Sequence, residues 1–414
     1  MPNLPFTLSL SLLSACTAAF ALPSAPTQED EVALLRARGP AGLDALLARW
    51  DRLAAGPERD ALAAEIDQVA QQRYATTSRM YWYTDLATAT AAAQQRHVPI
   101  LELRLLGRLD EELSCANSRL FRATLYANTE VSKFLREHFV LYWSTERPVP
   151  KVTIEFGDGR TIHTTAVGNS AHFIRDEHGA IVDLLPGVYA PAPFRAELEN
   201  TLAMLATLDA TNADHRRAQL REYHARRAQE TRSSWALFAS RPFARQFAGL
   251  LEHVEPASAV ALAQRLTISK AYIEVPQLGG IGADPGKLAD DETAAWAKVG
   301  ELAWPTSTPA PVLDKASRLL VLALHNAGPV KATTAELTAL IPRFEQHLMA
   351  DSALDQFKLR LQVHDYLATK PLEFAAIDRW LYAEVFKTPI TDRWLGLLPR
   401  TDVTGLPGDG ATAP

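Results

Sequence analysis

Residues 99–118, PILELRLLGRLDEELSCANS, decide how this 414-residue chain is expected to fold. The apolar run 99–106 is typical of a buried β-strand, and the residues after Ser118 have the spacing of an amphipathic helix. Cys115 lies between the two and opens the tetrad Cys115-Ala116-Asn117-Ser118. A cysteine at the start of a helix meets unpaired N–H groups and the positive end of the helix dipole, which favour its thiolate form.

Two interpretations of Cys115 remain open at this point. The connection 107–114 is long, and a helix that begins near Asp110 would place Cys115 in mid-helix, without any help from the dipole. Nearby arginines would lower the pKa of the thiol, whereas the acidic residues 110–112 would raise it. The thiol is therefore either a nucleophile or a partly buried structural group, since free cysteine often packs as a small hydrophobe.

The N-terminus predicts export. Residues 1–21 carry no charged side chain, and their apolar stretch is too short and too interrupted to span a bilayer. Ala19-Phe20-Ala21 is a small-x-small cleavage site, whereas Leu13-Ser14-Ala15-Cys16 has the form of a lipobox in which Cys16 would carry a lipid anchor. The short apolar core and the missing Lys or Arg favour cleavage and release. We expect a periplasmic or secreted protein, with a membrane-anchored lipoprotein as the alternative.

Composition points to a globular protein. The chain is 47% apolar and 22% charged, which suits roughly two to three domains with large cores. Its net charge of −6 gives no general attraction to nucleic acid, so no nucleic-acid partner is expected. No later segment is long enough to span a membrane. Because no nucleotide, zinc-protease or nucleophile-elbow motif is present, we expect no cofactor.

The order of elements between residues 79 and 208 alternates between helix and strand. Helical patterns at 85–95, 130–138 and 193–208 alternate with strand patterns at 99–106 and 139–143 and with two hairpins in 152–185. This order predicts an α/β sandwich. In order and spacing, it resembles a thioredoxin-like domain, with "PILELRLLG" and "FVLYW" as strands, "SAHFIRDEHGAIVDLLPG" as the terminal hairpin and "PFRAELENTL" as the closing helix.

The resemblance implies roles for particular residues. Ser118 stands where a second cysteine would resolve the first, as in monothiol (CxxS) members of the superfamily, and Asn117 would lie beside the thiol. The position of the proline that faces the reactive cysteine falls by spacing on Ser170, and Pro150 is the rival. One implied function is monothiol exchange of Cys115 with extracytoplasmic protein thiols, which needs an external thiol for release. The alternative is a catalytically inactive scaffold.

Helical patterns flank the α/β part on both sides. Residues 22–78 predict short packed helices, residues 209–400 an all-α domain, and residues 401–414 a disordered tail. The expected fold class is thus α/β plus α. In the inactive-scaffold alternative, the all-α domain binds a partner protein of the cell envelope. His347, Asp351 and Asp355 would share one helix face unless Asp351-Ser352 caps a new helix, and the segment from Trp380 predicts a strap across the helices.

Overall fold

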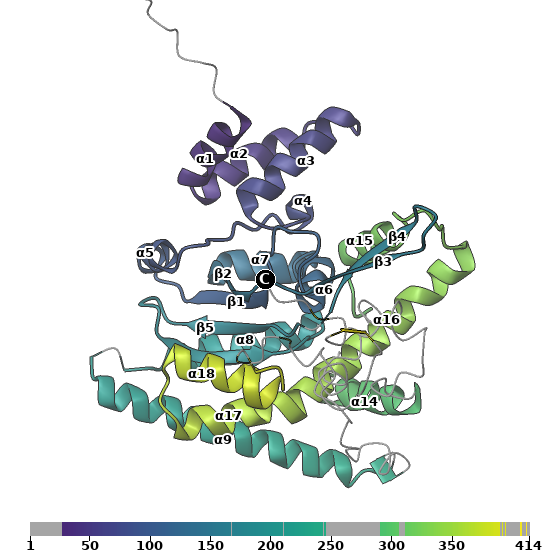
Figure 1. The fold of residues 1–414 in the computed structure, drawn as a ribbon. Helices are drawn as coiled ribbons and strands as arrows, with labels where there is room; N and C mark the ends of the chain where they lie inside the picture. The colour runs from purple at the N-terminus through teal and green to yellow at the C-terminus, as the bar shows by residue number, and fades with distance from the viewer. Residues whose placement is uncertain are drawn as a thin grey trace, which may run out of the picture.

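The computed structural model describes residues 27–245, 290–305 and 311–389, with single gaps at 167, 210 and 243, and isolated positions beyond residue 390. This part is a mixed α/β structure with a four-stranded sheet in the middle and helices at both ends (Figure 1). The predicted export signal with Cys16, residues 246–289 of the predicted all-α domain, and most of the predicted tail at 401–414 lie outside the described residues.

Three helices precede the sheet: α1 (Gln28–Ala37), α2 (Pro40–Trp50) and α3 (Pro57–Ala70). Thr27 begins α1 with a capping box, in which its hydroxyl accepts the Asp30 N–H and the Asp30 carboxylate accepts the Thr27 N–H. A Gly-Pro pair begins each of the next two helices, since proline lacks only an N–H that the first turn leaves unused. Their apolar sides form a separate small core, and the short helix α4 (Ala75–Ser78) leads on to the sheet.

The central elements follow in this order: α5 (Leu86–Arg96), β1 (Ile100–Leu106), α6 (Ala116–Thr124), α7 (Thr129–His138), β2 (Val140–Arg147), β3 (Lys151–Glu155), β4 (Thr161–Thr165), β5 (Ala171–Arg175), β6 (Ile181–Pro186) and α8 (Pro191–Leu205). The strand order in the sheet is β2-β1-β5-β6. β1 and β2 are parallel, whereas β5 is antiparallel to both β1 and β6. β3 and β4 form a separate hairpin that projects from the body (Figure 1).

The two faces of the sheet carry different helices. Leu103 pairs with His172, whose ring lies 4.7 Å from that of Phe121 on α6 and 4.8 Å from that of Phe194 on α8. Glu102 pairs with Phe173, whose side chain points to the other face and meets a C-terminal helix. This alternation is the period of two that a strand imposes, and it explains why β1 carries both leucines and charged residues.

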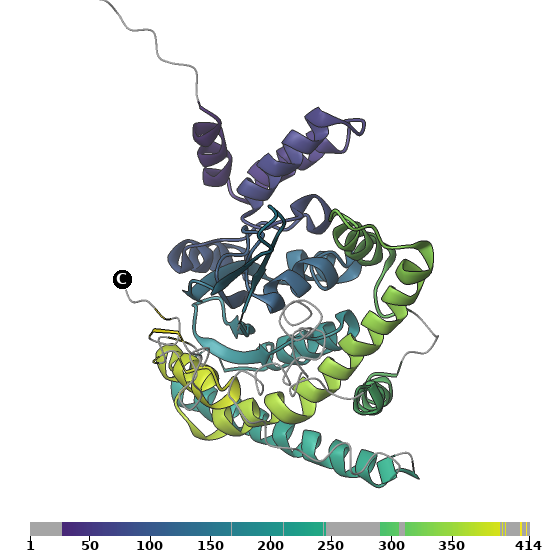
Figure 2. The ribbon, with the colours of Figure 1, turned by 45° about the vertical axis from the view of Figure 1, so that its right-hand side comes forward.

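The helical part is built from α9 (Ala213–Ala239), α14 (Asp290–Ala303), α15 (Lys315–His325), α16 (Thr334–Leu354), the π-helical turn η1 (Asp355–Arg360), α17 (Leu361–Thr369), α18 (Phe374–Trp380) and the π-helical turn η2 (Leu381–Val385). Figures 1 and 2 show α9 and α17 side by side below the sheet, and α16 as a long diagonal beside it. One hydrophobic core runs from Met80 to Phe386. The packing is therefore continuous across residue 208.

One predicted helix start was wrong, and one open alternative is decided by the structure. The helix expected to begin at Asp85 after Thr84 begins at Leu86, because the Asp85 carboxylate accepts the Thr88 N–H and is itself the cap. Asp351 and Ser352 do not cap a new helix, since α16 continues through them into η1. The shared helix face predicted for His347, Asp351 and Asp355 is consistent with this continuity, and all three side chains are buried.

Candidate functional site

Cys115 is the N-cap residue of α6. Its backbone is extended, with φ −59° and ψ 156°, and the helix starts at Ala116. The Cys115 N–H donates to the carbonyl of Leu106, 3.2 Å away, so the end of β1 holds the start of the helix. The mid-helix interpretation is therefore wrong, and the cysteine lies at the positive end of a nine-residue helix.

The thiol of Cys115 is closed off from solvent. The residue is 0% exposed, and its Sγ lies 3.1 Å from the Ser170 hydroxyl. The segment leading to Ser170 packs so closely that a Cβ on Gly168 would come within 2.6 Å of the Cys115 Cβ. Only glycine fits there, because 2.6 Å is well inside carbon–carbon contact. Of the two candidate residues, Ser170 and Pro150, it is thus Ser170 that lies against Cys115.

The other predicted site residues are placed differently. The Ser118 hydroxyl lies 2.6 Å from the Ser114 hydroxyl and donates to the Cys115 carbonyl at 2.8 Å, so it stabilises the turn. Asn117 is fully buried, and neither its amide oxygen nor its nitrogen has a hydrogen-bond partner. Pro150 accepts the Ala166 N–H beside the β3–β4 hairpin and is not in described contact with Cys115. None of the described peptide bonds is cis.

Arg122 holds the long connection before Cys115. Its buried guanidinium donates to the carbonyls of Leu109, Glu111 and Glu112, at 2.7 to 3.2 Å, and to the Ser114 hydroxyl at 3.1 Å. These bonds hold the connection in one conformation in front of α6. Sequence reasoning missed this residue, because an arginine in the last turn of an amphipathic helix gives no sign that it is buried.

The C-terminal segment closes the site from the side of β1 and β5. Asp378 on α18 accepts two hydrogen bonds of 3.2 Å from the Arg104 guanidinium, which also bonds to Glu146 of β2. The Tyr382 hydroxyl donates to the carbonyl of Asn169, the residue before Ser170, at 3.3 Å. The expected strap therefore lies on the sheet and over the segment that faces Cys115.

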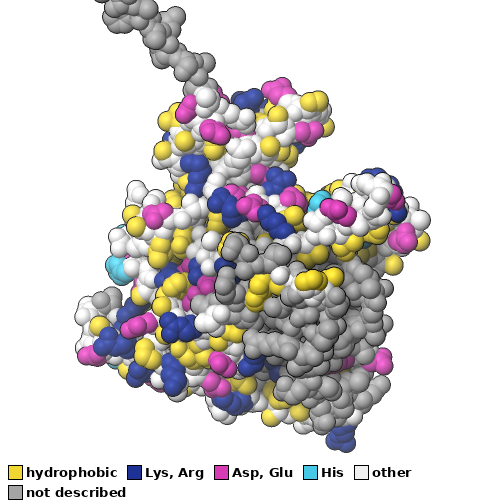
Figure 3. All heavy atoms as spheres, viewed as in Figure 1, with side chains coloured by type: hydrophobic (Ala, Val, Ile, Leu, Met, Phe, Trp, Pro, Cys, Tyr) yellow, Lys and Arg dark blue, Asp and Glu magenta, His cyan; other side chains and the backbone are white. Residues whose placement is uncertain are grey.

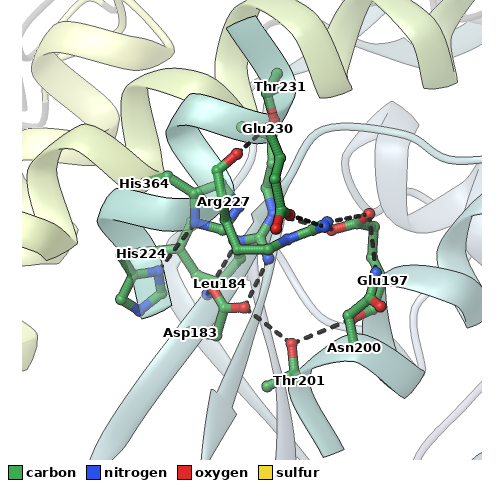
Figure 4. A network of polar contacts seen from close by, with 11 residues as sticks. Asp183, Leu184, Glu197, Asn200, Thr201, His224, Arg227, Glu230, Thr231 and His364 are labelled. Atoms are coloured by element: carbon green, nitrogen blue, oxygen red, sulfur yellow. Dashed lines mark hydrogen bonds and ion pairs between the residues drawn. The ribbon is translucent and has the colours of Figure 1, made fainter. Parts of the chain in front are cut away.

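A second polar cluster joins β6 to the helices (Figure 4). Asp183 receives two hydrogen bonds from the Arg360 guanidinium, of 2.5 and 2.6 Å, and both side chains are 0% exposed. The Leu184 N–H and the Thr201 hydroxyl also donate to this carboxylate. Burial alone would raise the pKa of Asp183, but the guanidinium holds it below its usual value.

A second set of ion pairs extends this cluster. Arg227 on α9 donates to both oxygens of Glu197 on α8, at 2.8 and 2.9 Å, and to Glu230 at 3.1 Å. Arg360 also lies 3.6 Å from Glu197, so two guanidiniums meet three carboxylates. The Asp183–Arg360 and Glu197–Arg227 pairs connect the α/β part with the helical part.

Two buried histidines lie beside this ion pair and raise the question of a metal. Among the described residues, Asp183, His224 and His364 form the one group close enough to share an ion. However, all acceptor positions of Asp183 are taken by its four donors, and a cation would lie against the Arg360 guanidinium. The donor set does not fit a metal.

The histidines instead satisfy each other as neutral rings. His224 Nε2 donates to the Val182 carbonyl at 2.9 Å, so its Nδ1 is an acceptor. His364 Nδ1, 2.9 Å away, is then the donor, and its Nε2 has no partner. Burial lowers the pKa of both rings, which keeps them uncharged.

Two buried polar residues where α16 meets η1 bind backbone groups. Asp355 accepts the Val188 N–H at 2.6 Å, and the Ser352 hydroxyl accepts the N–H of Ala190, the N-cap of α8. Burial, and then the charge of Asp351, raise the pKa of Asp355 well above its usual value. These side chains hold the turn between β6 and α8, which is a structural role.

No family model, no curated protein and no solved structure matches this chain. None of the described helices combines the length and apolar character needed to cross a membrane. The class of this protein must therefore be inferred from its own strand order and side chains.

Proposed function

We propose that this chain is an exported, thioredoxin-like protein whose thiol has become part of the core, and that it serves as a scaffold for a protein of the cell envelope. Three features support the thioredoxin-like assignment. The strand order is β2-β1-β5-β6, Cys115 caps the helix after β1, and Ser170 faces it from the start of β5. A thioredoxin-like fold alone does not imply thiol–disulfide exchange activity.

The burial of Cys115 is the observation that favours a scaffold role over thiol–disulfide exchange. In thiol–disulfide exchange, the Cys115 thiolate would attack one sulfur of a partner disulfide, form a mixed disulfide and release the other sulfur as a thiolate. That attack needs the partner sulfur in line with Sγ, which is 0% exposed. A second thiol would then have to release the mixed disulfide, and Ser118 cannot supply it. The observation that favours exchange is the N-cap position of Cys115.

The helices that cover the sheet are part of one folded body. Ile377, Leu381 and Tyr382 are at most 1% exposed, and the Asp183–Arg360 pair is fully buried between β6 and η1. Detaching these helices would uncover apolar surface and a buried charge together, which is costly. We infer that they form a permanent layer.

The surface that would meet a partner lies on α15 and the start of α16. Of α15, only Ser317 is buried, although the helix carries four leucines and a valine. Leu319 is 57% exposed. A pocket of about 640 Å³, lined mainly by residues 330–332 and α16, has Leu340 and Phe344 in its lining. Figure 3 shows hydrophobic side chains along the lower edge of the β3–β4 hairpin. Exposed apolar patches of this kind mark interaction sites.

The test is co-purification from cell-envelope extracts with matched surface variants. Leu319→Asp and Val330→Asp place charges on the exposed α15–α16 surface, and Leu34→Asp places one on an equally exposed site of α1. The account expects a partner that the wild type and Leu34→Asp retain and the other two variants lose. A partner captured equally by all four proteins would contradict this docking surface.

A further inference from the structure

A pocket of about 310 Å³ lies where the N-terminal helices meet the α/β part. One wall is the start of α2, and the opposite wall is formed by α5, α7 and the beginning of β2. Its lining consists of Pro40, Leu43, Asp44, Arg79, Tyr81, Tyr83, Arg96, Arg136, Phe139, Val140 and Leu141. The volume is at the lower end of the range for small-molecule sites.

Three arginines line this small space, and Asp44 is the only acidic residue among the lining residues. Arg79 is neutralised by Asp51, to which it donates two bonds of 3.0 and 2.9 Å. Arg96 donates to the backbone carbonyls of Phe139 and Arg136, at 3.0 and 2.8 Å. Carbonyls satisfy its donors but do not cancel its charge.

Arg136 is the least compensated of the three. Its one described hydrogen bond runs from Nε to the Ser132 carbonyl at 3.1 Å, which leaves both terminal nitrogens as donors. Arg136 is an exposed residue. Partial burial, and then the charge of Arg79, lower its pKa, while Asp44 and Glu137 offset this in part. The surroundings of Arg136 thus disfavour its charged form, and a bound anion would stabilise that form.

A hydroxyl group adds a neutral donor to the pocket. Tyr83 lines the pocket, and no described residue accepts a hydrogen bond from its hydroxyl. The neighbouring Tyr81 hydroxyl, by contrast, donates to the Arg36 carbonyl at 3.0 Å. The pocket therefore offers free donors from Arg136 and Tyr83, beside the fixed charge of Arg96.

We propose that this pocket binds the phosphate group of a small organic phosphate. Guanidinium groups pair with phosphate through two parallel hydrogen bonds, and a dianion gains more than a monoanion from several nearby cations. The oxygens of a tetrahedral phosphate point in different directions. One phosphate can therefore accept hydrogen bonds from both Arg136 and Tyr83, which come from different segments of the pocket wall. The site is independent of Cys115 and goes beyond the scaffold role.

The experiment is isothermal titration of the full mature chain with glycerol 3-phosphate, inorganic phosphate and succinate. Arg136→Gln removes the free guanidinium, Tyr83→Phe removes only the hydroxyl, and Arg160→Gln is a control with the same charge change on the exposed β3–β4 turn. We expect saturable binding of glycerol 3-phosphate that weakens by about tenfold or more in Arg136→Gln, less in Tyr83→Phe, and not in Arg160→Gln.

Three results would overturn the proposal. They are the absence of saturable heat with either phosphate, equal weakening by Arg136→Gln and Arg160→Gln, and equal affinity for succinate, which would make the pocket a general anion site. Circular dichroism of each variant checks that it is folded. If Arg136→Gln perturbs α7, Tyr83→Phe still tests the pocket, because it removes only a hydroxyl and keeps the aromatic ring.

Discussion

Asp183 and Arg360, 177 residues apart, form a two-bond ion pair from which water is excluded. This pair joins the edge strand of the sheet to the turn between α16 and α17. The helical layer therefore belongs to the same folded body as the sheet and Cys115. If the layer detached, Asp183 or Arg360 would be left as a buried charge without its partner. The scaffold interpretation depends on this permanence.

The first prediction concerns that pair. Arg360→Met should lower the free energy of unfolding by about 3–5 kcal/mol, since it leaves the Asp183 carboxylate buried without a cation. Urea denaturation followed by circular dichroism measures the loss. The double variant Asp183→Asn/Arg360→Met should recover part of it, because the uncompensated charge is gone. A loss below about 1 kcal/mol in the single variant would mean that the pair is not buried in solution.

The second prediction tests the thioredoxin-like placement of Cys115. Ser118→Cys puts a second sulfur three residues further on, at the first turn of α6, where the two Cα atoms should be about 5.5 Å apart. We expect the variant, when it is refolded from urea under mild oxidation, to form an intramolecular disulfide, detected as a mass loss of about 2 Da without dimer formation. Two free thiols after oxidation would argue against that geometry.

The third prediction concerns pH. Burial raises the pKa of Asp378 to about 6, Glu146 adds to this, and Arg104 opposes it. A carboxyl with a raised folded-state pKa binds its proton more tightly when folded, so its contribution to stability is lost as the pH rises from about 4 to about 6. Relative to Asp378→Asn, the wild type should therefore lose stability over that window.

The measurement is urea denaturation of the wild type, Asp378→Asn and Asp60→Asn between pH 4 and pH 7. Asp60 is an exposed residue of α3 and serves as the control. The difference between the wild type and Asp378→Asn should change with pH, and the Asp60→Asn variant provides the baseline for a carboxyl-to-amide change at an exposed site. A pH-independent difference for Asp378→Asn would mean that its carboxyl is not held by the fold in this way.

Local patterns predicted the sheet well. The runs around Leu103 and Phe173 have the alternation and the turn signals of strands, and both are strands in the structure. Sequence spacing also made Ser170 one of two candidates for the position opposite Cys115. These features depend on neighbours within a few residues or on the order of elements, which a single sequence contains.

Long-range partners could not be predicted. No residue near Arg360 in the sequence indicates that its partner is a carboxylate 177 residues away. Arg104 likewise has the pattern of an exposed charge on a strand, and its partner Asp378 is 274 residues away. The same holds for the burial of Cys115. The local sequence is compatible with either an exposed or a buried thiol. The thiol is buried because the segment around Gly168 packs against it and the C-terminal turn covers that segment.

The central claim is that the Cys115 thiol is closed, and its rate of alkylation tests this most directly. A chain that begins at residue 22 has Cys115 as its only thiol, so iodoacetamide labelling followed by mass spectrometry reports that sulfur alone. The account predicts labelling of the folded chain at least about a thousandfold slower than in urea, limited by opening of the fold. Labelling at a comparable rate in both states, together with a mixed disulfide formed with glutathione disulfide, would contradict it and restore the exchange function.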